Sequence, residues 1–229
     1  MSQTVGRLMA RKKQMINSGD NIGADMFEII DLTKLLDKNL SIYTEDAYSD
    51  PPLQIETWCT IQEQGYKVSR LSMGTQTGTH IDAPAHFVFD GATLETLPLQ
   101  ALIGEYLWVD IDQITQDKLS ELQSSSKGMS ILFLTSLRQT ETEISEEVFK
   151  ALLNLPCLVW VIVYGIQVAE CEPLYFHKAL SEAGKYLIED IDETMAMRVK
   201  ADGEMIALPL RLSGTSGSPC RVIVRQSVK

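Results

Sequence analysis

Short apolar runs of strand length recur in the central part of the chain. They cover residues 106–111, 130–134 and 157–163, and polar or turn-forming residues separate them. Runs of this length and composition predict strands that are buried on both faces. The most apolar stretch, residues 155–164, is about half as long as a membrane-spanning helix, so we interpret it as a buried strand. Further strands are predicted at residues 27–32, 67–73, 186–191, 205–212 and 221–225.

Two helices are predicted between these strands. The first begins after Ser145, a favourable N-cap followed by two glutamates that suit the positive end of the helix dipole, and it ends before Pro156. The second runs from Pro173 to Ala183, because proline suits the first turn of a helix and Gly184 suits the position past its end. The strand–helix–strand order indicates a crossover unit, and the whole pattern predicts a mixed α/β fold with more strand than helix.

The composition predicts one folded domain and restricts the classes of molecule that it can bind. Of 229 residues, 45% are hydrophobic and no linker divides them, so we expect one domain at residues 25–229 after an N-terminal arm or tail at residues 1–24. The formal net charge of -11 disfavours nucleic acid and anionic membrane surfaces as partners. Four cysteines lie far apart without a CxxC pair, and no apolar signal segment follows the basic N-terminal residues, so a cytoplasmic protein is expected.

A short stretch in the first half of the chain holds two of its three histidines. In an extended segment, His80 and Asp82 would point to the same side. An imidazole nitrogen and a carboxylate oxygen form a usable ligand set for zinc, manganese or iron. Gly78 would allow the backbone to approach a ligand closely, and Pro84 would stiffen a turn that returns His86 to the same place.

The third histidine can be assigned to the same site. His177 lies on the second predicted helix, and Glu189 follows twelve positions later on the next predicted strand. A helix that stops at Gly184 and turns back would bring both side chains together. For each of these residues taken alone, a purely structural role stays open as the alternative to a metal site. In that case residues 77–79 form a turn, Asp82 caps a helix and His177 contributes only to packing.

The segment from Gln76 to Phe87, QTGTHIDAPAHF, resembles the signature HxGTHxDxPxHF of the cyclase family of metal-dependent hydrolases. That family includes bacterial kynurenine formamidases and isatin hydrolases. The resemblance extends in collinear order over roughly residues 27 to 226, with further similar segments at residues 29–33, 104–110, 177–189, 207–212 and 217–221. It implies a swivelling β/β/α fold, a mixed sheet with flanking helices in a single domain, usually assembled as a homodimer or homotetramer.

The resemblance also implies a role for each polar residue of the site. His80 and Asp82 would bind a divalent metal, and His86 would be the catalytic acid and base. His177 and Glu189 match the remaining polar residues, which help to bind the metal and to hold the reacting group, so Glu189 is expected to act in catalysis as well. The implied cofactor is zinc or manganese, as one or two ions.

The chain departs from the family pattern at three positions. Gln76 stands where the first histidine of the motif is expected, and its carbonyl oxygen is a weaker and harder ligand than imidazole. Gln76 would therefore lower the affinity for zinc and favour manganese, magnesium or a single ion, or it does not bind metal at all. Aspartates are also missing near Gln167 and near Ser216. These changes bear on the usual substrate and, to a lesser degree, on catalysis.

Four aromatic residues are candidates for the wall of a substrate pocket. They are Tyr43, Phe87, Phe89 and Trp108, and the two phenylalanines are favoured because they flank the motif. Core packing is the alternative for each of them.

The expected function is hydrolysis of an amide, lactam or ester bond in a small molecule. A metal-activated water would attack the carbonyl carbon, with His86 as general acid and base. Two alternatives remain. One is a cyclase or lyase of secondary metabolism, which product analysis would reveal. The other is a non-catalytic, metal-free binding protein, which metal analysis would reveal.

Overall fold

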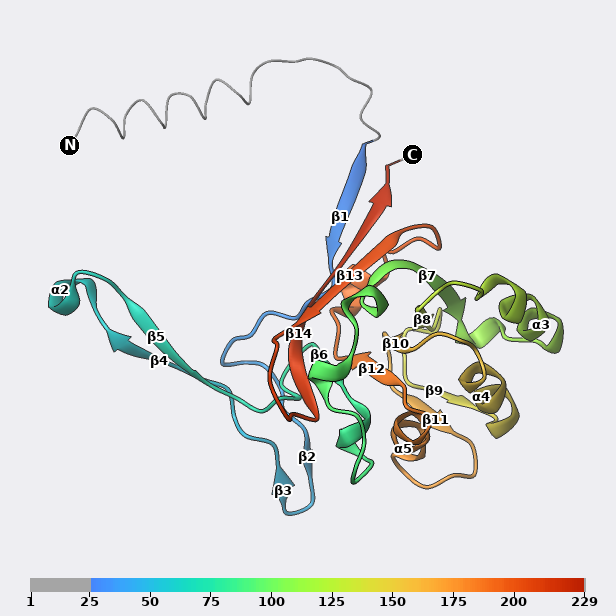
Figure 1. Cartoon of the computed structure of the whole chain (residues 1–229), viewed down its shortest axis with the longest axis horizontal. Coiled ribbons are helices and arrows are strands. Elements are labelled where there is room, and N and C mark those ends of the chain that lie inside the picture. Colours follow the sequence, from blue (N-terminus) through green and yellow to red (C-terminus); the bar gives the residue numbers. More distant parts are fainter. Residues whose placement is uncertain (1–25, 229) are drawn as a thin grey trace.

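A computed structural model describes residues 26–228, so the arm or tail expected at residues 1–24 lies outside the described residues. The main sheet has eight strands in the order β1-β14-β13-β7-β8-β10-β12-β6, and β6 also pairs with β14 (Figure 1). The sheet from β14 round to β6 therefore closes into a barrel. Its strands are β1 (Phe27–Asp31), β6 (His80–Asp82), β7 (Ile103–Asp110), β8 (Ile131–Thr135), β10 (Val159–Ile162), β12 (Tyr186–Glu189), β13 (Glu204–Pro209) and β14 (Gly217–Ser227).

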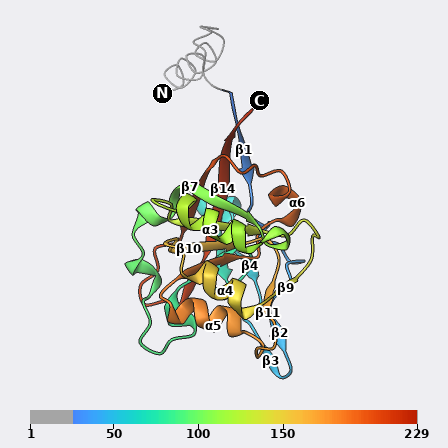
Figure 2. The ribbon, with the colours of Figure 1, turned by 90° about the vertical axis from the view of Figure 1, so that its right-hand side faces the viewer.

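Three crossover helices connect the parallel part of this sheet. Strands β7, β8, β10 and β12 run parallel to one another, whereas the other pairings are antiparallel. The helices lie on one face of the parallel strands, as the two views show (Figures 1 and 2). They are α3 (Gln116–Ser125), α4 (Glu146–Leu153) and α5 (Tyr175–Glu182). The predicted mixed α/β fold with crossover units is confirmed.

The parallel strands are buried on both faces, which explains their continuous apolar runs. One set of alternate residues, including Phe133 and Val161, packs inside the barrel. The other set, including Leu132 and Trp160, packs against the helices through Phe149 of α4 and its neighbours. Because each face meets a different core, no polar alternation is visible in these segments. The interpretation of residues 155–164 as a buried strand is confirmed for their centre, β10, whereas residues 155–158 form the turn that follows α4.

The helix termini follow the sequence signals closely. The Ser145 side chain accepts a hydrogen bond from the Val148 backbone N–H, so it caps α4 as predicted. The predicted stop of α5 is confirmed, because Gly184 adopts a left-handed φ of 71° just past its end. The start of α5 is later than predicted, since Leu174 takes a left-handed φ of 66° and the helix begins only at Tyr175. No described helix is long and apolar enough to cross a membrane.

A long hairpin projects from the barrel (Figure 1). From here on, the arm means this hairpin and not residues 1–24. It consists of β4 (Gln54–Cys59), α2 (Ile61–Gln64) and β5 (Val68–Ser72). The strand predicted at residues 67–73 is therefore confirmed as β5, but it pairs with β4 rather than with the barrel. The remaining short elements are β2 (Thr44–Glu45), β3 (Tyr48–Ser49), β9 (Thr142–Ile144), β11 (Ile166–Val168) and α6 (Glu193–Ala196).

Candidate metal centre

The closing strand β6 brings the central residues of the site together. Glu189 of β12 lies directly opposite His80, and Gly217 of β14 lies opposite Asp82. Side chains two apart on a strand share a face, as do directly opposed residues of an antiparallel pair. His80 and Asp82 therefore point to the same side as Glu189, as predicted for the first two, while Ile81 points into the core and is fully buried.

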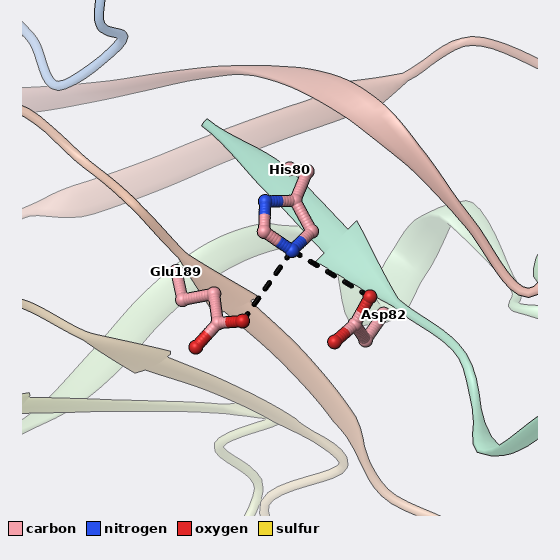
Figure 3. A group of neighbouring side chains, drawn as sticks. All are labelled: His80, Asp82 and Glu189. Atoms are coloured by element: carbon pink, nitrogen blue, oxygen red, sulfur yellow. Dashed lines mark ion pairs between the residues drawn. The ribbon is translucent and has the colours of Figure 1, made fainter. Parts of the chain in front are cut away.

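The two carboxylates converge on one histidine. His80 Nε2 lies 3.6 Å from Asp82 Oδ1 and 3.4 Å from Glu189 Oε1 (Figure 3). The ligand atoms of these three residues all lie within 4.8 Å of one another. His80 and Asp82 are only 4% and 5% exposed, whereas the Glu189 side chain keeps 24% of its surface exposed. The site is therefore shielded on the β6 side and open to solvent on the Glu189 side.

The outer oxygen of each carboxylate faces a further histidine. Asp82 Oδ2 lies 3.9 Å from His86 Nε2, and Glu189 Oε2 lies 3.2 Å from His177 Nε2. These five residues, in the order His86–Asp82–His80–Glu189–His177, form what we call the histidine–carboxylate network. The structure thus brings all three histidines of the chain to one place, as the sequence predicted.

The backbone carbonyl of Gly78 orients the central imidazole. His80 Nδ1 lies 2.7 Å from this oxygen, and a carbonyl can only accept, so Nδ1 carries a proton and Nε2 faces the carboxylates. Gly78 has a left-handed φ of 66°, and a Cβ there would lie 2.7 Å from Leu36 Cδ2. The glycine is therefore required for the turn and for packing against Leu36, in place of the close ligand approach that the sequence suggested.

A short 3-10 turn, Pro84–His86, and helix α5 supply the two outer histidines. The Pro84–His86 turn follows β6 directly, and the His86 N–H donates to the Ala83 carbonyl over 2.8 Å. This turn returns His86 toward Asp82, as predicted for Pro84, and leaves 33% of its side chain exposed. Phe87 lies between the outer histidines, with its ring centroid 4.6 Å from that of His86 and 5.9 Å from that of His177.

Electrostatic coupling within the network favours a positive charge at its centre. Burial alone would lower the pKa of His80, but the contacts with Glu189 and Asp82 outweigh it and raise that pKa to about 9. Burial raises the pKa of Asp82, and the charge of Glu189 adds to this effect. Burial would also raise the pKa of Glu189, yet its hydrogen bonds with His177 and His80 hold that pKa well below its usual range. Two carboxylates that face one imidazole at this separation form a set that a divalent cation fits.

Gln76 also reaches Asp82. Its Nε2 lies 3.3 Å from Asp82 Oδ1 and 3.3 Å from Ser216 Oγ, and its Oε1 accepts a 2.6 Å hydrogen bond from Thr75 Oγ1. Gln76 and Ser216, two of the three positions at which the sequence departs from the family pattern, are therefore in contact. Sequence reasoning treated them separately because 140 positions lie between them.

A cleft of about 400 Å³ opens onto Glu189 at the carboxyl ends of β10 and β12. Ligands bind at this edge of parallel strands in many α/β proteins. Lys34, Tyr164 and Glu193 contribute to its walls, and sequence reasoning assigned none of them to a site. The only sequence signal for them was the position of Tyr164 at the end of an apolar run.

The four aromatic candidates are placed unequally. Phe87 contacts the outer histidines. Phe89 is 99% exposed, Tyr43 binds Glu45 through its hydroxyl group, and Trp108 packs against the barrel interior. The structure therefore brings only Phe87 of these four to the network, and a role for the others in substrate binding stays a prediction.

Metal binding to the network is expected to release a proton. Because the pKa of His80 is raised to about 9, its imidazole is protonated at pH 7 in the metal-free protein, and a cation on Nε2 must displace that proton. Calorimetric titration with manganese at pH 7, in two buffers of different ionisation enthalpy, should give about one proton released per ion bound.

The apparent affinity should rise as the pH increases toward 9 and level off above it, where His80 is already neutral. The His80→Ala variant is the control and should show neither metal binding nor proton release. An affinity that does not change between pH 6.5 and pH 9 would contradict this assignment.

Comparison with known proteins agrees with this fold. The family described as "Putative cyclase" matches residues 30–167. Kynurenine formamidase from Bacillus cereus is 28% identical over 209 residues, which covers 86% of this chain and 97% of that protein, and kynurenine formamidase from Bacillus cytotoxicus is 27% identical over 213 residues, with the same coverage.

Solved structures show the same architecture. Isatin hydrolase A from Labrenzia aggregata, bound to benzyl benzoate, superimposes with a TM-score of 0.72 at 21% identity, over 95% of this chain and all of that chain. A structure described as a potential metal-dependent hydrolase with cyclase activity has a TM-score of 0.63 at 26% identity, over 89% of this chain and all of that chain. The expected swivelling β/β/α fold is confirmed, and with a family match over more than half of its length this chain belongs to the cyclase family.

Proposed function

We propose that this chain is a metal-dependent hydrolase that cleaves a carbon–nitrogen bond of the amide type in a small molecule. The observation that carries the proposal is the convergence of the His80, Asp82 and Glu189 ligand atoms within 4.8 Å, with His86 beside Asp82. The relatives named above support the reaction class, since kynurenine formamidases and isatin hydrolases both hydrolyse such bonds outside peptides. A formamide or a lactam is the substrate that this likeness favours.

The cation is proposed to bind through one imidazole nitrogen and two carboxylate oxygens. This donor set suits zinc and manganese, as one or two ions. When bound, a divalent cation lowers the pKa of a water molecule and polarises a carbonyl oxygen. Asp82 and Glu189 supply the negative charge that holds it, and the Gly78 carbonyl keeps His80 Nε2 turned toward it.

His86 is proposed as the general acid and base. Its Nε2 lies 3.9 Å from Asp82 Oδ2, and a third of its side chain is open to solvent, so it can exchange protons beside the Asp82 carboxylate. His86 would take a proton from the attacking water and give it to the leaving nitrogen or oxygen. His177 holds Glu189 from the other side, so the two outer histidines have different tasks.

Metal content and product identity together test this function. We expect stoichiometric zinc or manganese in the protein after incubation with either ion, and none in the His80→Ala variant. The loaded protein should hydrolyse members of a panel of aryl formamides, lactams and cyclic imides. Wild-type protein that binds no metal would overturn the proposal in favour of a binding protein. Conversion without net addition of water would favour a cyclase or lyase.

The His86→Ala variant should separate metal binding from proton transfer. We expect it to retain its metal, because His86 faces only the outer oxygen of Asp82, and to lose about 10²–10⁴-fold in turnover. Asp90→Ala, an exposed position near the end of the same loop, is the matched control and should keep both properties. A His86→Ala variant with near-normal turnover would contradict the role given to His86.

The net charge and the cysteines support a proposal about the partners and the cellular location of the enzyme. The net charge of -11 favours a small-molecule partner over nucleic acid or a membrane surface. All four cysteines are free, which is typical of a reducing compartment, so we propose a cytoplasmic location.

The arm supports assembly as a homodimer or homotetramer. A two-stranded hairpin is marginally stable alone in water, and this one carries Trp58, Ile61 and Tyr66 with 70%, 62% and 62% of their surfaces exposed. Exposed apolar groups that cluster on one element are typical of an interaction surface. Because symmetric assemblies of identical chains are the commonest oligomers, a second copy is the partner that we propose.

Light scattering should report a mass that is two or four times the 25.6 kDa of one chain. The Trp58→Glu variant should shift this mass toward that of the monomer, because it places a charge in the buried interface. Leu35→Glu, at a position that is 78% exposed outside the arm, is the matched control and should not change the mass. A monomeric wild-type protein would exclude this role of the arm.

A further inference from the structure

Gln76 and the central histidine approach the same oxygen of Asp82. Asp82 Oδ1 lies 3.6 Å from His80 Nε2 and 3.3 Å from Gln76 Nε2, while Oδ2 faces His86. A carboxylate oxygen only accepts hydrogen bonds, so the end of the Gln76 amide that faces it must be the nitrogen. The Gln76 amide is therefore a donor to Asp82, and its nitrogen, which has no free lone pair, is the atom turned toward the site.

The oxygen of the same amide is engaged elsewhere. Gln76 Oε1 accepts a 2.6 Å hydrogen bond from Thr75 Oγ1, its neighbour in the chain. The amide nitrogen lies 3.3 Å from Ser216 Oγ as well as from Asp82. Both ends of the amide are therefore occupied. Rotating the amide to present Oε1 to a cation would break all three contacts and would place Oε1 against an oxygen of the Asp82 carboxylate, where neither atom can donate a hydrogen bond.

The backbone of β14 provides the space for this arrangement. Gly217 lies opposite Asp82, and a Cβ at Gly217 would come within 2.6 Å of Gln76 Nε2 and 3.1 Å of Asp82 Oδ1. The Ser216 carbonyl accepts a hydrogen bond from the Ala83 N–H over 2.8 Å, which ties the start of β14 to the end of β6. The amide thus fits a slot whose walls are fixed to the strand that carries Asp82.

We infer that Gln76 is a positioning residue rather than a metal ligand: it holds the Asp82 carboxylate in place for the cation, with Ser216 supporting the amide. The inference rests on the proposed function, because it concerns the same cation site. It assigns a shared task to two of the three positions where this chain departs from the family pattern. Hydrogen-bond partners of metal ligands commonly affect affinity 10–100-fold without touching the metal, and this is the size of effect expected here.

Cobalt is a suitable probe, because its visible absorption spectrum reports the number and geometry of its ligands. In the Gln76→Leu variant, all three amide contacts are lost while the length of the side chain is nearly kept. We expect the cobalt affinity to fall about 10–100-fold and the spectrum at saturating cobalt to match that of the wild type. Gln123→Leu, the same substitution at an exposed residue of α3, is the matched control and should change neither quantity.

A second variant keeps the test independent of how well Gln76→Leu folds. Ser216→Ala removes one contact of the amide and leaves Gln76 itself in place, so its cobalt affinity should fall in the same direction, by less, with an unchanged spectrum. Thermal denaturation of each metal-free variant checks that the affinity change is not a consequence of partial unfolding.

The outcomes separate this inference from the function on which it rests. A changed spectrum in Gln76→Leu, beside a wild type that binds cobalt stoichiometrically, would make Gln76 a ligand and overturn the inference alone. An unchanged affinity in both variants would also overturn it. Wild-type protein that binds no cobalt would overturn the proposed function and the inference together.

Discussion

Two carboxylates that share one partly buried site need a positive charge between them. Asp82 is almost wholly buried and Glu189 is largely so, and in a medium of low dielectric their mutual repulsion is strong. His80 lies between them, and the two outer histidines face their remaining oxygens. The alternation of histidine and carboxylate along the network offsets the cost of bringing these groups together. It also leaves Asp82 Oδ1, Glu189 Oε1 and His80 Nε2 close to one another, in an arrangement that can bind a divalent cation.

The barrel closure creates this arrangement. Strand β6 has only three residues, yet it joins the parallel half of the sheet at β12 to the antiparallel half at β14. Its register places His80 beside Glu189 and Asp82 beside Gly217. Glycines at positions 78 and 217 remove side chains that would otherwise collide with neighbouring groups. The site is thus built on strands held by two neighbours each, which limits the movement of the ligands.

The local pattern of the sequence predicted much of the fold for identifiable reasons. The parallel strands could be found because burial on both faces makes them continuously apolar, and α4 could be found from Ser145 and the acidic first turn. Helix α3 was missed, since its stretch is mainly polar and only Leu119 and Leu122 of its described side chains are buried. Strand β5 was recognised as a strand, but the pattern carried no information about its pairing.

For the site, the sequence by itself determined that His80 and Asp82 share a side, because alternation along a strand is a local property of the backbone. It also determined which five residues were chemically suited to one network. Only the tertiary structure decided that Glu189 lies opposite His80, that Phe87 alone of the four aromatic candidates reaches the network, and that Gln76 contacts Ser216. These contacts depend on strand register and barrel closure, which are set by packing of the whole core between segments that are far apart in the sequence, and no local pattern encodes them.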